Sequence, residues 1–279
     1  MQSRLPDCVL VVDNCSSDGT KEYLENLESF DLTTKVRAIH LDKNLGGAGG
    51  FYCGMKYAVD NKFDYVWLMD DDGYPNDNSL ELLLKHASQH RIVGPIVSIS
   101  PTDKHLSFPF RIPGTIRFVD SLSQFKHRYP LLANNVIFPF NGTLISKQVI
   151  ETIGLPRAEY FIWGDEAEYV YRARRAKFET ATVTDAKFYH PRGLTNAQPM
   201  FFNLLLFNEP KQDIKLLCLV RNSIRNYLDY RSVFHAFGFA CKVLWFYVFT
   251  HPNLSRLKLT IFGISDAIAK NFERHKEFL

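Results

Sequence analysis

The stretch Asp64-Tyr-Val-Trp-Leu-Met-Asp-Asp-Asp-Gly73 decides the fold of this chain. Its apolar half, Tyr65 to Met69, is aromatic and branched and holds no Pro or Gly, which predicts a buried strand. Three adjacent carboxylates follow. Because like charges repel, a fold that gathers them at a strand end usually supplies a counter-ion, and the natural one is a divalent cation with oxygen ligands, Mg²⁺ or Mn²⁺. The alternative is a solvated acidic turn, since Asp-Gly is a common turn pair.

The composition is that of an ordinary globular protein. The 279 residues, 46% hydrophobic and 23% charged, suffice for one large domain or two small ones. A net charge of +3 gives no case for nucleic acid as a partner. Widely spaced cysteines without a CxxC pair favour a reducing, cytoplasmic compartment, and the polar start of the chain predicts no signal peptide. No stretch reaches the ~18 uncharged apolar residues that a membrane span needs.

Strands and helices alternate through the first part of the chain. Apolar runs at 8–12 and 36–40 predict two further strands, each followed by a helical segment. This alternation predicts an α/β fold with a mainly parallel sheet. In such sheets ligands bind at the carboxyl ends of the strands, where Asp13 and Asp70 both stand. The alternative for Asp13 is a simple cap of the loop that follows it, and the residues alone do not choose between the two.

Four glycines in five positions open the second helical segment, in Asn44-Leu-Gly-Gly-Ala-Gly-Gly-Phe51. The run is no dinucleotide fingerprint, because Tyr52 stands where the third glycine would be, and no Walker A loop, because no Gly-Lys-Ser/Thr follows. Glycines at a helix start let the backbone approach a diphosphate or a sugar. Close helix–sheet packing is the alternative. We favour the ligand, because packing rarely needs so many glycines.

A second acidic cluster follows an aromatic approach, in Tyr160-Phe-Ile-Trp-Gly-Asp-Glu-Ala-Glu168. Acids open this predicted helix and basic residues close it, which by itself suits the helix dipole. The aromatic residues in front predict acids at the lip of an apolar, sugar-stacking pocket. A carboxylate at a helix N-terminus stays ionised near neutral pH, as a general base toward an alcohol must. His190 ends a later strand and is a candidate metal ligand, although a lone histidine is more often a surface or packed residue.

Beyond about residue 193 the alternation stops, so we predict domains at 1–193 and 194–279. Helices are expected at 201–207, 214–230, 233–250 and 254–272. Arg221 and Arg225 lie among apolar residues and could contact phosphates, but a solvated face is favoured. The apolar segment 233–250 is interrupted by Lys242 and is poor as a membrane span. We expect a buried helix there, with peripheral contact to a membrane surface as the alternative.

Taken together, the motifs resemble the family 2 inverting glycosyltransferases, above all their galactofuranosyl- and rhamnosyltransferase branch. The resemblance runs from about Leu5 to His190. It is carried by Val-Val-Asp13-Asn-x-Ser-x-Asp-Gly-Thr20, the glycine run, Trp67-Leu-Met-Asp-Asp-Asp72, Asn141-Gly-Thr, the acidic helix and the final histidine. It implies a GT-A (Rossmann-like) fold, a nucleotide-sugar donor and a divalent metal, Mn²⁺ or Mg²⁺. The implied reaction is inverting transfer from UDP-galactofuranose or dTDP-rhamnose to a glycan acceptor in cell-surface polysaccharide synthesis.

The resemblance also implies a role for each acidic position. Asp165 matches the catalytic base, and Asp70, Asp72 and His190 match the metal ligands. Asp13 would contact the nucleoside, and Glu168 the acceptor hydroxyls. Donor or acceptor binding is expected from the set Asp13, Asn44, Gly46, Gly47, Asp70, Asp71, Trp163, Glu166 and Glu168.

The chain departs from the family pattern at its start. Family members carry an extra strand and helix before the strand that ends at Asp13, so we expect a fold that lacks the first strand and a chain that is the N-terminally short form of a longer protein. The alternative function is a non-catalytic nucleotide-sugar-binding remnant. A nucleotidyltransferase is disfavoured, because no basic phosphate-loop signature occurs. The expected partners are the donor and a glycan acceptor, either free or linked to lipid. The expected location is the cytoplasm, with the inner face of the plasma membrane as a special case.

Overall fold

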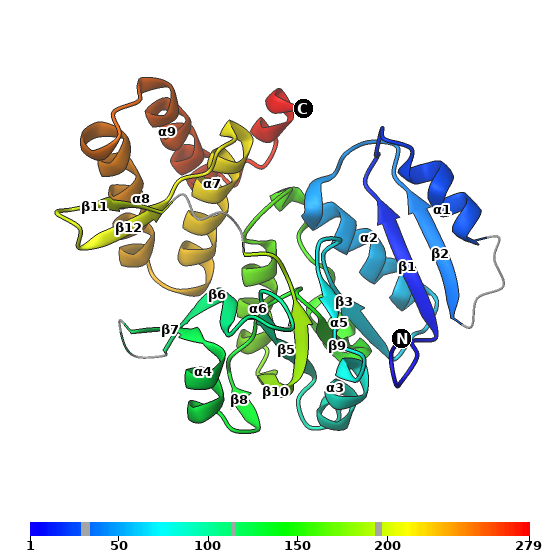
Figure 1. Cartoon of the computed structure of the whole chain (residues 1–279). Helices are drawn as coiled ribbons and strands as arrows, with labels where there is room; N and C mark the ends of the chain where they lie inside the picture. The colour runs from blue at the N-terminus through cyan, green and yellow to red at the C-terminus, as the bar shows by residue number, and fades with distance from the viewer. Residues whose placement is uncertain (29–33, 113–114, 116, 193–196) are drawn as a thin grey trace. The chain divides into compact units, whose positions relative to one another are not determined.

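The computed structural model of the chain describes residues 1–28, 34–112, 115, 117–192 and 197–279 (Figure 1). The chain folds into two compact units, each built from segments that are distant in the sequence. Unit 1 comprises Met1–Asp42, Cys53–Leu155 and Arg172–Gly193, and unit 2 comprises Lys43–Tyr52, Pro156–Tyr171 and Leu194–Leu279. The glycine run and the acidic helix start therefore belong to the same unit as the C-terminal region. The predicted domain boundary at residue 193 stays a prediction.

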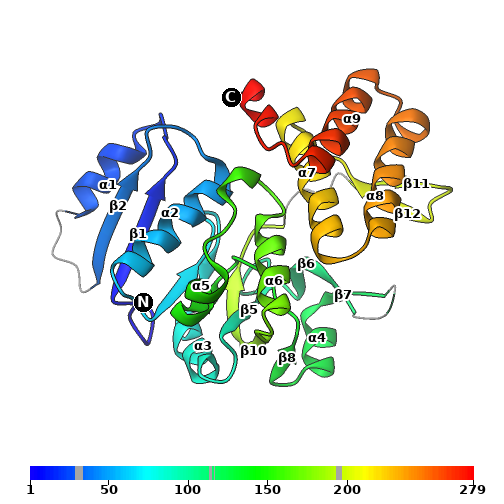
Figure 2. The same cartoon turned by 180° about the vertical axis from the view of Figure 1, so that it is seen from behind.

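Unit 1 is an α/β structure (Figures 1 and 2). Its strands are β1 (Cys8–Asp13), β2 (Lys35–His40), β3 (Tyr65–Leu68), β4 (Tyr74–Pro75), β5 (Ile92–Ser98), β6 (His105–Arg111), β7 (Phe118–Ser121), β8 (Leu132–Asn134), β9 (Thr143–Ser146) and β10 (Thr180–Tyr189). Its helices are α1 (Thr20–Glu28), α3 (Ser79–Ala87), α4 (Leu122–Arg128) and α5 (Lys147–Ile153). Two further helices, α2 (Gly46–Asp60) and α6 (Asp165–Arg175), are divided between the units.

The strands of unit 1 form two sheets. β1 and β2 pair in parallel, with Asp13 opposite His40 at their ends. The larger sheet has the order β3-β9-β5-β10-β4, with β6, β7 and β8 attached. The predicted α/β class is confirmed, but the sheet is mixed rather than mainly parallel. The reason is β9, which enters between β3 and β5 and runs antiparallel to both, whereas β5 and β10 are parallel.

The core of unit 1 lies on the two faces of the central strand β5, which is buried along its whole length. On one face, α3 packs with Leu80, Leu83 and Ala87, whose spacing of three and four residues puts them on one side of the helix. At the carboxyl end of β5, Ile96 and Val97 join a second cluster that includes Phe125 and Phe188. Hydrophobic burial on both faces fixes the strands whose ends carry the acidic residues.

Unit 2 is a helical unit with one hairpin. Its elements are β11 (Ala197–Met200), β12 (Leu205–Asn208), α7 (Asp213–Tyr230), α8 (Val233–Trp245), a π-helix (Phe246–Thr250), α9 (Leu254–Ala269) and two short 3-10 helices (Ala158–Tyr160 and Arg274–Phe278). The predicted helix at 201–207 is wrong. Phe201, Phe202 and Asn203 have φ of 50°, 55° and 67°, which a right-handed helix excludes, and they form the turn between β11 and β12.

The three other C-terminal helices occur near their predicted positions, and the last one ends at Ala269 because Lys270 adopts a left-handed conformation. Leu216, Val220 and Ile224, four residues apart on α7, pack into a core shared with α8 and α9. The expectation of a buried helix at 233–250 is wrong, since one of its faces is exposed. Phe234 is 81% exposed and Phe249 is 65% exposed.

Candidate active site

The acidic stretch after β3 meets the end of β10. One ligand atom from each of Asp70, Asp72 and His190 lies within 4.8 Å of the other two. Asp72 Oδ1 lies 2.9 Å from His190 Nε2. The third neighbouring acid, Asp71, is exposed and does not belong to this group of described residues. The structure therefore brings together the three predicted metal ligands within unit 1.

The pairing of β4 with β10 explains this meeting. The two strands are antiparallel, with Tyr74 opposite Tyr189, so the residues just before β4 face those just after β10. Gly73 permits the approach, because a Cβ atom at this position would lie 2.3 Å from Cε1 of the Phe188 ring. The glycine of the acidic motif is thus required by packing against β10, and φ at this position is not positive.

His190 is fixed in one orientation. Its Nδ1 lies 2.6 Å from the carbonyl oxygen of Pro191, so this nitrogen carries the hydrogen and donates it. The lone pair of Nε2 then faces Asp72. The backbone N–H of His190 donates to Ser98 O at 3.0 Å, and the Ser107 hydroxyl donates to His190 O at 2.6 Å. A second hydrogen bond that fixes the tautomer is typical of metal-binding histidines.

The donor set fits a divalent cation. Two carboxylates and one imidazole are ligands that Mn²⁺ accepts, and Mg²⁺ takes the carboxylates. Two ligand atoms about 2.1 Å from an octahedral cation, at right angles, are about 3 Å apart. The 2.9 Å between Asp72 Oδ1 and His190 Nε2 agrees with that value. A cation bound among these ligand atoms would relieve the repulsion between the carboxylates.

Asp13 lies at the end of β1, in the two-stranded sheet, and not in the sheet that carries Asp70. Its side chain is buried and bonds locally: Oδ2 lies 2.9 Å from His40 Nδ1, and Oδ1 accepts the Ser16 N–H at 3.0 Å. The hydrogen bond to His40, followed by that to Ser16, lowers the pKa of the Asp13 carboxyl. The expectation that both acids end one sheet is wrong. The loop-cap interpretation of Asp13 is confirmed, and its contact with a nucleoside stays a prediction.

In unit 2, the glycine run begins α2. Asn44 Oδ1 accepts the N–H of Gly46 at 2.8 Å and so caps this helix start. Gly46 has φ of 69°, and a Cβ atom on it would lie 2.1 Å from Phe161 O, to which Ala48 donates a hydrogen bond at 3.1 Å. Packing therefore accounts for Gly46. Gly47 is exposed, and a Cβ atom there would meet nothing within 4 Å, so its backbone remains open to a ligand.

The loop before α6 has an unusual backbone. Phe161, Trp163 and Gly164 have φ of 65°, 61° and 92°, the left-handed region that costs a residue with a side chain about 1–3 kcal/mol. The amide of Asn222, on α7, holds this loop. Its Nδ2 lies 3.0, 3.1 and 2.7 Å from the carbonyl oxygens of Tyr160, Ile162 and Trp163.

Two further polar side chains of α7, Arg221 and Asn226, hold the same loop, and together with Asn222 we call them the clamp. Arg221 is fully buried and donates from Nη2 to Tyr160 O at 3.0 Å and from Nε to Asn222 Oδ1 at 2.9 Å. Asn226 Nδ2 donates to Gly164 O at 2.8 Å, and its Oδ1 accepts the Tyr160 hydroxyl at 2.8 Å. The expected solvated face for Arg221 is therefore wrong, because the loop carbonyls replace water around its guanidinium. Arg225 is also buried and pairs with Asp229.

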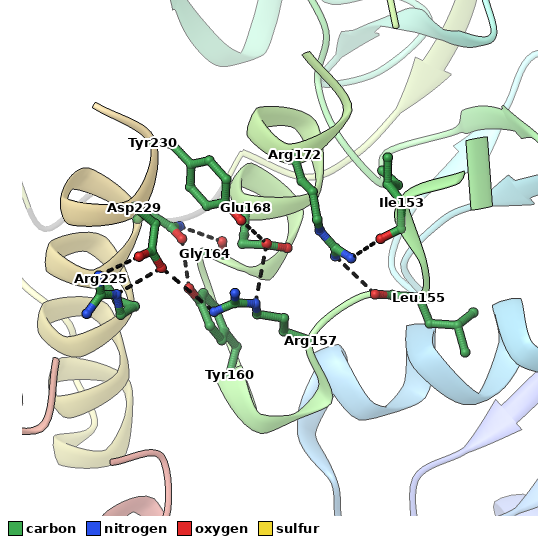
Figure 3. A network of polar contacts seen from close by, with 11 residues as sticks. Ile153, Leu155, Arg157, Tyr160, Gly164, Glu168, Arg172, Arg225, Asp229 and Tyr230 are labelled. Carbon is green, nitrogen blue, oxygen red and sulfur yellow. Dashed lines mark hydrogen bonds and ion pairs between the residues drawn. The ribbon is translucent and has the colours of Figure 1, made fainter. Parts of the chain in front are cut away.

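The acids of α6 have different surroundings. Asp165 is the first residue of the helix and is 4% exposed. Glu166 accepts the N–H of Gly164 at 2.9 Å. Glu168 is fully buried, accepts the Tyr230 hydroxyl at 2.6 Å and lies 3.4 Å from Arg157 Nε (Figure 3). In this arrangement Glu168 has no exposed surface for an acceptor hydroxyl, so the predicted acceptor contact would need the carboxylate to be uncovered.

An exposed tryptophan, Trp163, lies shortly before α6. The Trp163 indole is 38% exposed, and Lys215 Nζ lies 5.5 Å from the ring centroid. An exposed indole is a surface on which a sugar can stack.

In unit 1, Arg172, on the later part of α6, donates to Ile153 O at 2.5 Å and to Leu155 O at 3.0 Å (Figure 3). These two hydrogen bonds from Arg172 fix the end of α5.

No role was predicted from the sequence for Asn222 and Asn226, which hold the loop, or for Tyr230 and Arg157, which contact Glu168. A signal for the first two was present. Arg221-Asn222 and Arg225-Asn226 repeat a polar pair four residues apart within an otherwise apolar stretch of helix. Polar side chains with that spacing lie on one side of a helix, and burial demands partners for them.

Comparison with known proteins shows the family of this chain. The model of the family described as Glycosyl transferase family 2 matches residues 1–154. The chain belongs to this family. The galactofuranosyltransferase GlfT1 of Mycolicibacterium smegmatis is 31% identical over 239 residues, which cover 81% of this chain and 74% of that protein. GlfT1 of Mycobacterium tuberculosis is 32% identical over 226 residues, 79% and 72% of the two chains. The dTDP-rhamnosyl transferase RfbF of Shigella flexneri is 22% identical over 231 residues, 81% and 75% of the two chains.

Solved structures similar to this family 2 chain are glycosyltransferases too. The structure of GalNAc-T7 with UDP, GalNAc and Mn²⁺ has a TM-score of 0.52 at 12% identity and covers 98% of this chain and 53% of its own. The mannosyltransferase PcManGT from Pyrobaculum calidifontis, with GDP-Man and Mn²⁺, has a TM-score of 0.51 at 13% identity and covers 96% and 68%. At these identities the likeness shows the fold, and the predicted GT-A class is confirmed.

Proposed function

We propose that this chain transfers galactofuranose from UDP-galactofuranose to a glycan acceptor, with inversion at the anomeric carbon and with a divalent metal at Asp70, Asp72 and His190. Relatives named galactofuranosyltransferases at 31% and 32% identity support this sugar over rhamnose, whose named relative is 22% identical. The five free cysteines support a place in the reducing cytoplasm. The product would be part of a cell-surface polysaccharide.

The meeting of Asp70, Asp72 and His190 carries the proposal. Acids that are separated from a histidine by more than a hundred residues converge, and a packed glycine and a fixed tautomer hold them there. A divalent cation bound at this position would neutralise charge on the diphosphate and make the nucleoside diphosphate a better leaving group. The exposed backbone of Gly47 and the carboxylate of Asp13 are proposed to bind other parts of the donor.

The chain's own residues would perform a single displacement. Asp165 accepts the proton of an acceptor hydroxyl, and the oxygen forms a bond to the anomeric carbon from the face opposite the nucleotide. The bond between that carbon and the diphosphate oxygen breaks, and UDP leaves with the bonding electrons. Trp163 would offer its exposed indole to a sugar ring, and Glu166 would hold the start of α6 through Gly164. Asp71, exposed beside the cluster, would approach the ribose or diphosphate.

Product formation from defined donors tests the proposal. The purified chain is incubated with Mn²⁺ and a galactofuranose-containing oligosaccharide acceptor, and with UDP-galactofuranose or dTDP-rhamnose as donor. The expected result is acceptor extended by galactofuranose, with release of UDP and a β linkage from an α donor. The variant Asp165→Asn should lose at least about a hundredfold in turnover, the range that removal of a positioned base produces, while UDP binding is retained.

Other results of this experiment would support a different function or mechanism. Extension from dTDP-rhamnose alone would transfer the proposal to the rhamnosyl branch. Donor binding without any product, in both the wild-type chain and Asp165→Asn, would favour a non-catalytic nucleotide-sugar-binding protein. Retention of the anomeric configuration would refute the single displacement.

A further inference from the structure

One face of α8 is apolar and exposed. Phe234, Phe237, Cys241, Trp245 and Val248 follow one another at intervals of three or four residues, and each is exposed. Side chains with this spacing lie along one side of a helix. No charged residue interrupts the stripe. A row of exposed apolar side chains this long is uncommon on a protein that is surrounded by water alone.

The hairpin of unit 2 extends this stripe. Figures 1 and 2 both show β11 and β12 beside α8. The Phe201 ring stacks on the Trp245 ring with centroids 4.4 Å apart, and Trp245 lies 4.4 Å from Phe249. The turn residue Phe202 is 95% exposed and Leu204 is 81% exposed. We use the name apolar face for the set Phe202, Leu204, Leu206, Phe234, Phe237, Trp245, Val248 and Phe249.

The opposite side of α8 packs against protein. Ala236 and Val243, with Phe246 and Tyr247 of the π-helix, are buried in the core that α7 and α9 share. By length and composition the segment Val233–Thr250 could cross a membrane. A spanning helix with lipid on all sides would have to give up this packing. A helix that lies in the plane of a membrane surface keeps its packed side on the protein and turns only its exposed side to the lipid.

The sequence segment that contains α8 carries charge of one sign. Between Asp229 and Asp266 the sequence contains no acidic residue, but it contains Arg231, Lys242 and Lys258. In the part of the chain that the structure describes, these three cations contact aromatic rings, and none has a carboxylate in an ion pair. Arg256, in contrast, pairs with Glu209. Aromatic side chains among cations that lack acidic partners complement a surface with negative head groups.

From this arrangement we infer that the apolar face docks on an anionic lipid bilayer, with α8 lying in the interface and the turn at Phe202 inserted beside it. A second copy of the chain is a poorer occupant, because in a two-fold contact both sides would bring the same cations and the segment between Asp229 and Asp266 would offer them no acid. The inference does not depend on the proposed reaction, since it concerns only unit 2 and a lipid surface.

Vesicle sedimentation with the full chain tests the inference. Vesicles of phosphatidylcholine alone and vesicles with about a third phosphatidylglycerol are compared at low and high salt. We expect binding to the anionic vesicles and weaker binding in high salt. The variant Phe234→Gln/Phe237→Gln/Phe249→Gln should reduce the partition coefficient at least about tenfold, because each ring that inserts contributes a transfer free energy.

A matched variant controls for the loss of aromatic rings in general. Tyr23→Gln/Phe118→Gln removes two exposed rings of unit 1, which are 66% and 63% exposed, and it should bind like the wild-type chain. Retained thermal unfolding in all variants, expected for exposed positions, shows that they fold. Equal binding by the α8 variant and the wild-type chain, equal binding to neutral vesicles, or no vesicle binding at all would each overturn the inference. A wild-type dimer that this variant dissociates would assign the face to a second copy instead.

Discussion

Replacement of Asn222 by alanine is the sharpest test of how the site is held. Asn222 lies on α7 and is fully buried, and its amide reaches three carbonyl oxygens of the loop that precedes Asp165. Alanine keeps the helix but removes every one of these donors. The loop carbonyls of Ile162 and Trp163 would then lose this donor, whereas Tyr160 O keeps the hydrogen bond from Arg221 Nη2. We expect Asn222→Ala to lower both the free energy of unfolding and the turnover number.

The magnitude follows from the number of bonds. The amide nitrogen has two hydrogens, so two of its three contacts can be full hydrogen bonds at one time. Loss of a bond that leaves a buried carbonyl unsatisfied costs about 1–3 kcal/mol, which gives about 2–6 kcal/mol for two such bonds. Phe161 and Trp163 store about 1–3 kcal/mol each in their left-handed backbone, and without the amide they can relax. Asp165 would shift with them, and a displacement near 1 Å can cost on the order of a hundredfold in rate.

Two measurements separate these effects. Urea denaturation gives the free energy of unfolding, and donor-dependent UDP release gives turnover and KM. The matched control is Asn61→Ala, the same substitution at an exposed site where Nδ2 donates a single bond to Tyr57 O at 2.8 Å. The control should lose under about 1 kcal/mol, as an exposed hydrogen bond contributes little. UDP binding should persist in both variants.

An Asn222→Ala variant with wild-type turnover would refute the view that the clamp positions Asp165. A variant with normal stability would refute the hydrogen bonds themselves. Loss of UDP binding in parallel with turnover would show that the substitution disturbs the donor site and not the base alone.

Three further outcomes are expected. Gly73→Ala should lower the free energy of unfolding by about 1–3 kcal/mol, since its Cβ would lie 2.3 Å from the Phe188 ring. The same variant should bind Mn²⁺ more weakly because Asp72 is displaced. Urea denaturation measures the first effect and Mn²⁺ titration the second. Tyr230→Phe should cost about 1–3 kcal/mol in thermal or urea unfolding, because buried Glu168 loses a donor at 2.6 Å, whereas Tyr23→Phe on the surface should cost nothing measurable. The hydrogen bond to His40 lowers the pKa of Asp13, so the stability that this bond contributes is present above the unfolded pKa of about 3.9 and is lost as pH falls through the lower folded pKa. In acid unfolding, Asp13→Asn should therefore be less stable than the wild-type chain at pH 6 and should lose less stability below pH 4. Parallel curves of stability against pH for the two proteins would contradict this.

The sequence predicted the elements that local pattern and burial determine. The apolar runs that became β1 and β3 are continuous and end in turn residues, so their type follows from composition alone, and β2 is interrupted only by Arg37. The metal cluster was also accessible, because three acids in a row demand a counter-charge. The antiparallel β9 was not, since it has only four residues and its pairing depends on contacts distant in sequence. The turn at Phe201–Asn203 was missed for the same reason, because its left-handed backbone is imposed by the pairing of β11 with β12.

The environment of individual side chains was harder still to predict from the sequence. Nothing in the local pattern separates Gly46, which packing requires, from Gly47, which remains open. Glu168 and Glu166 are two residues apart, yet the first is sealed by Tyr230 and the second holds a loop N–H. Arg221 looked like a surface residue because its partners, the loop carbonyls, leave no mark in the sequence.

The most direct test of the whole account is Mn²⁺ binding in the presence of UDP. Electron paramagnetic resonance of free Mn²⁺ gives the number of ions bound and their affinity. The account predicts one ion per chain and a loss of affinity of about 10–100-fold in either His190→Ala or Asp72→Asn, with Asp71→Asn affected less. Mn²⁺ and UDP binding that is unchanged in both of the first two variants would contradict it.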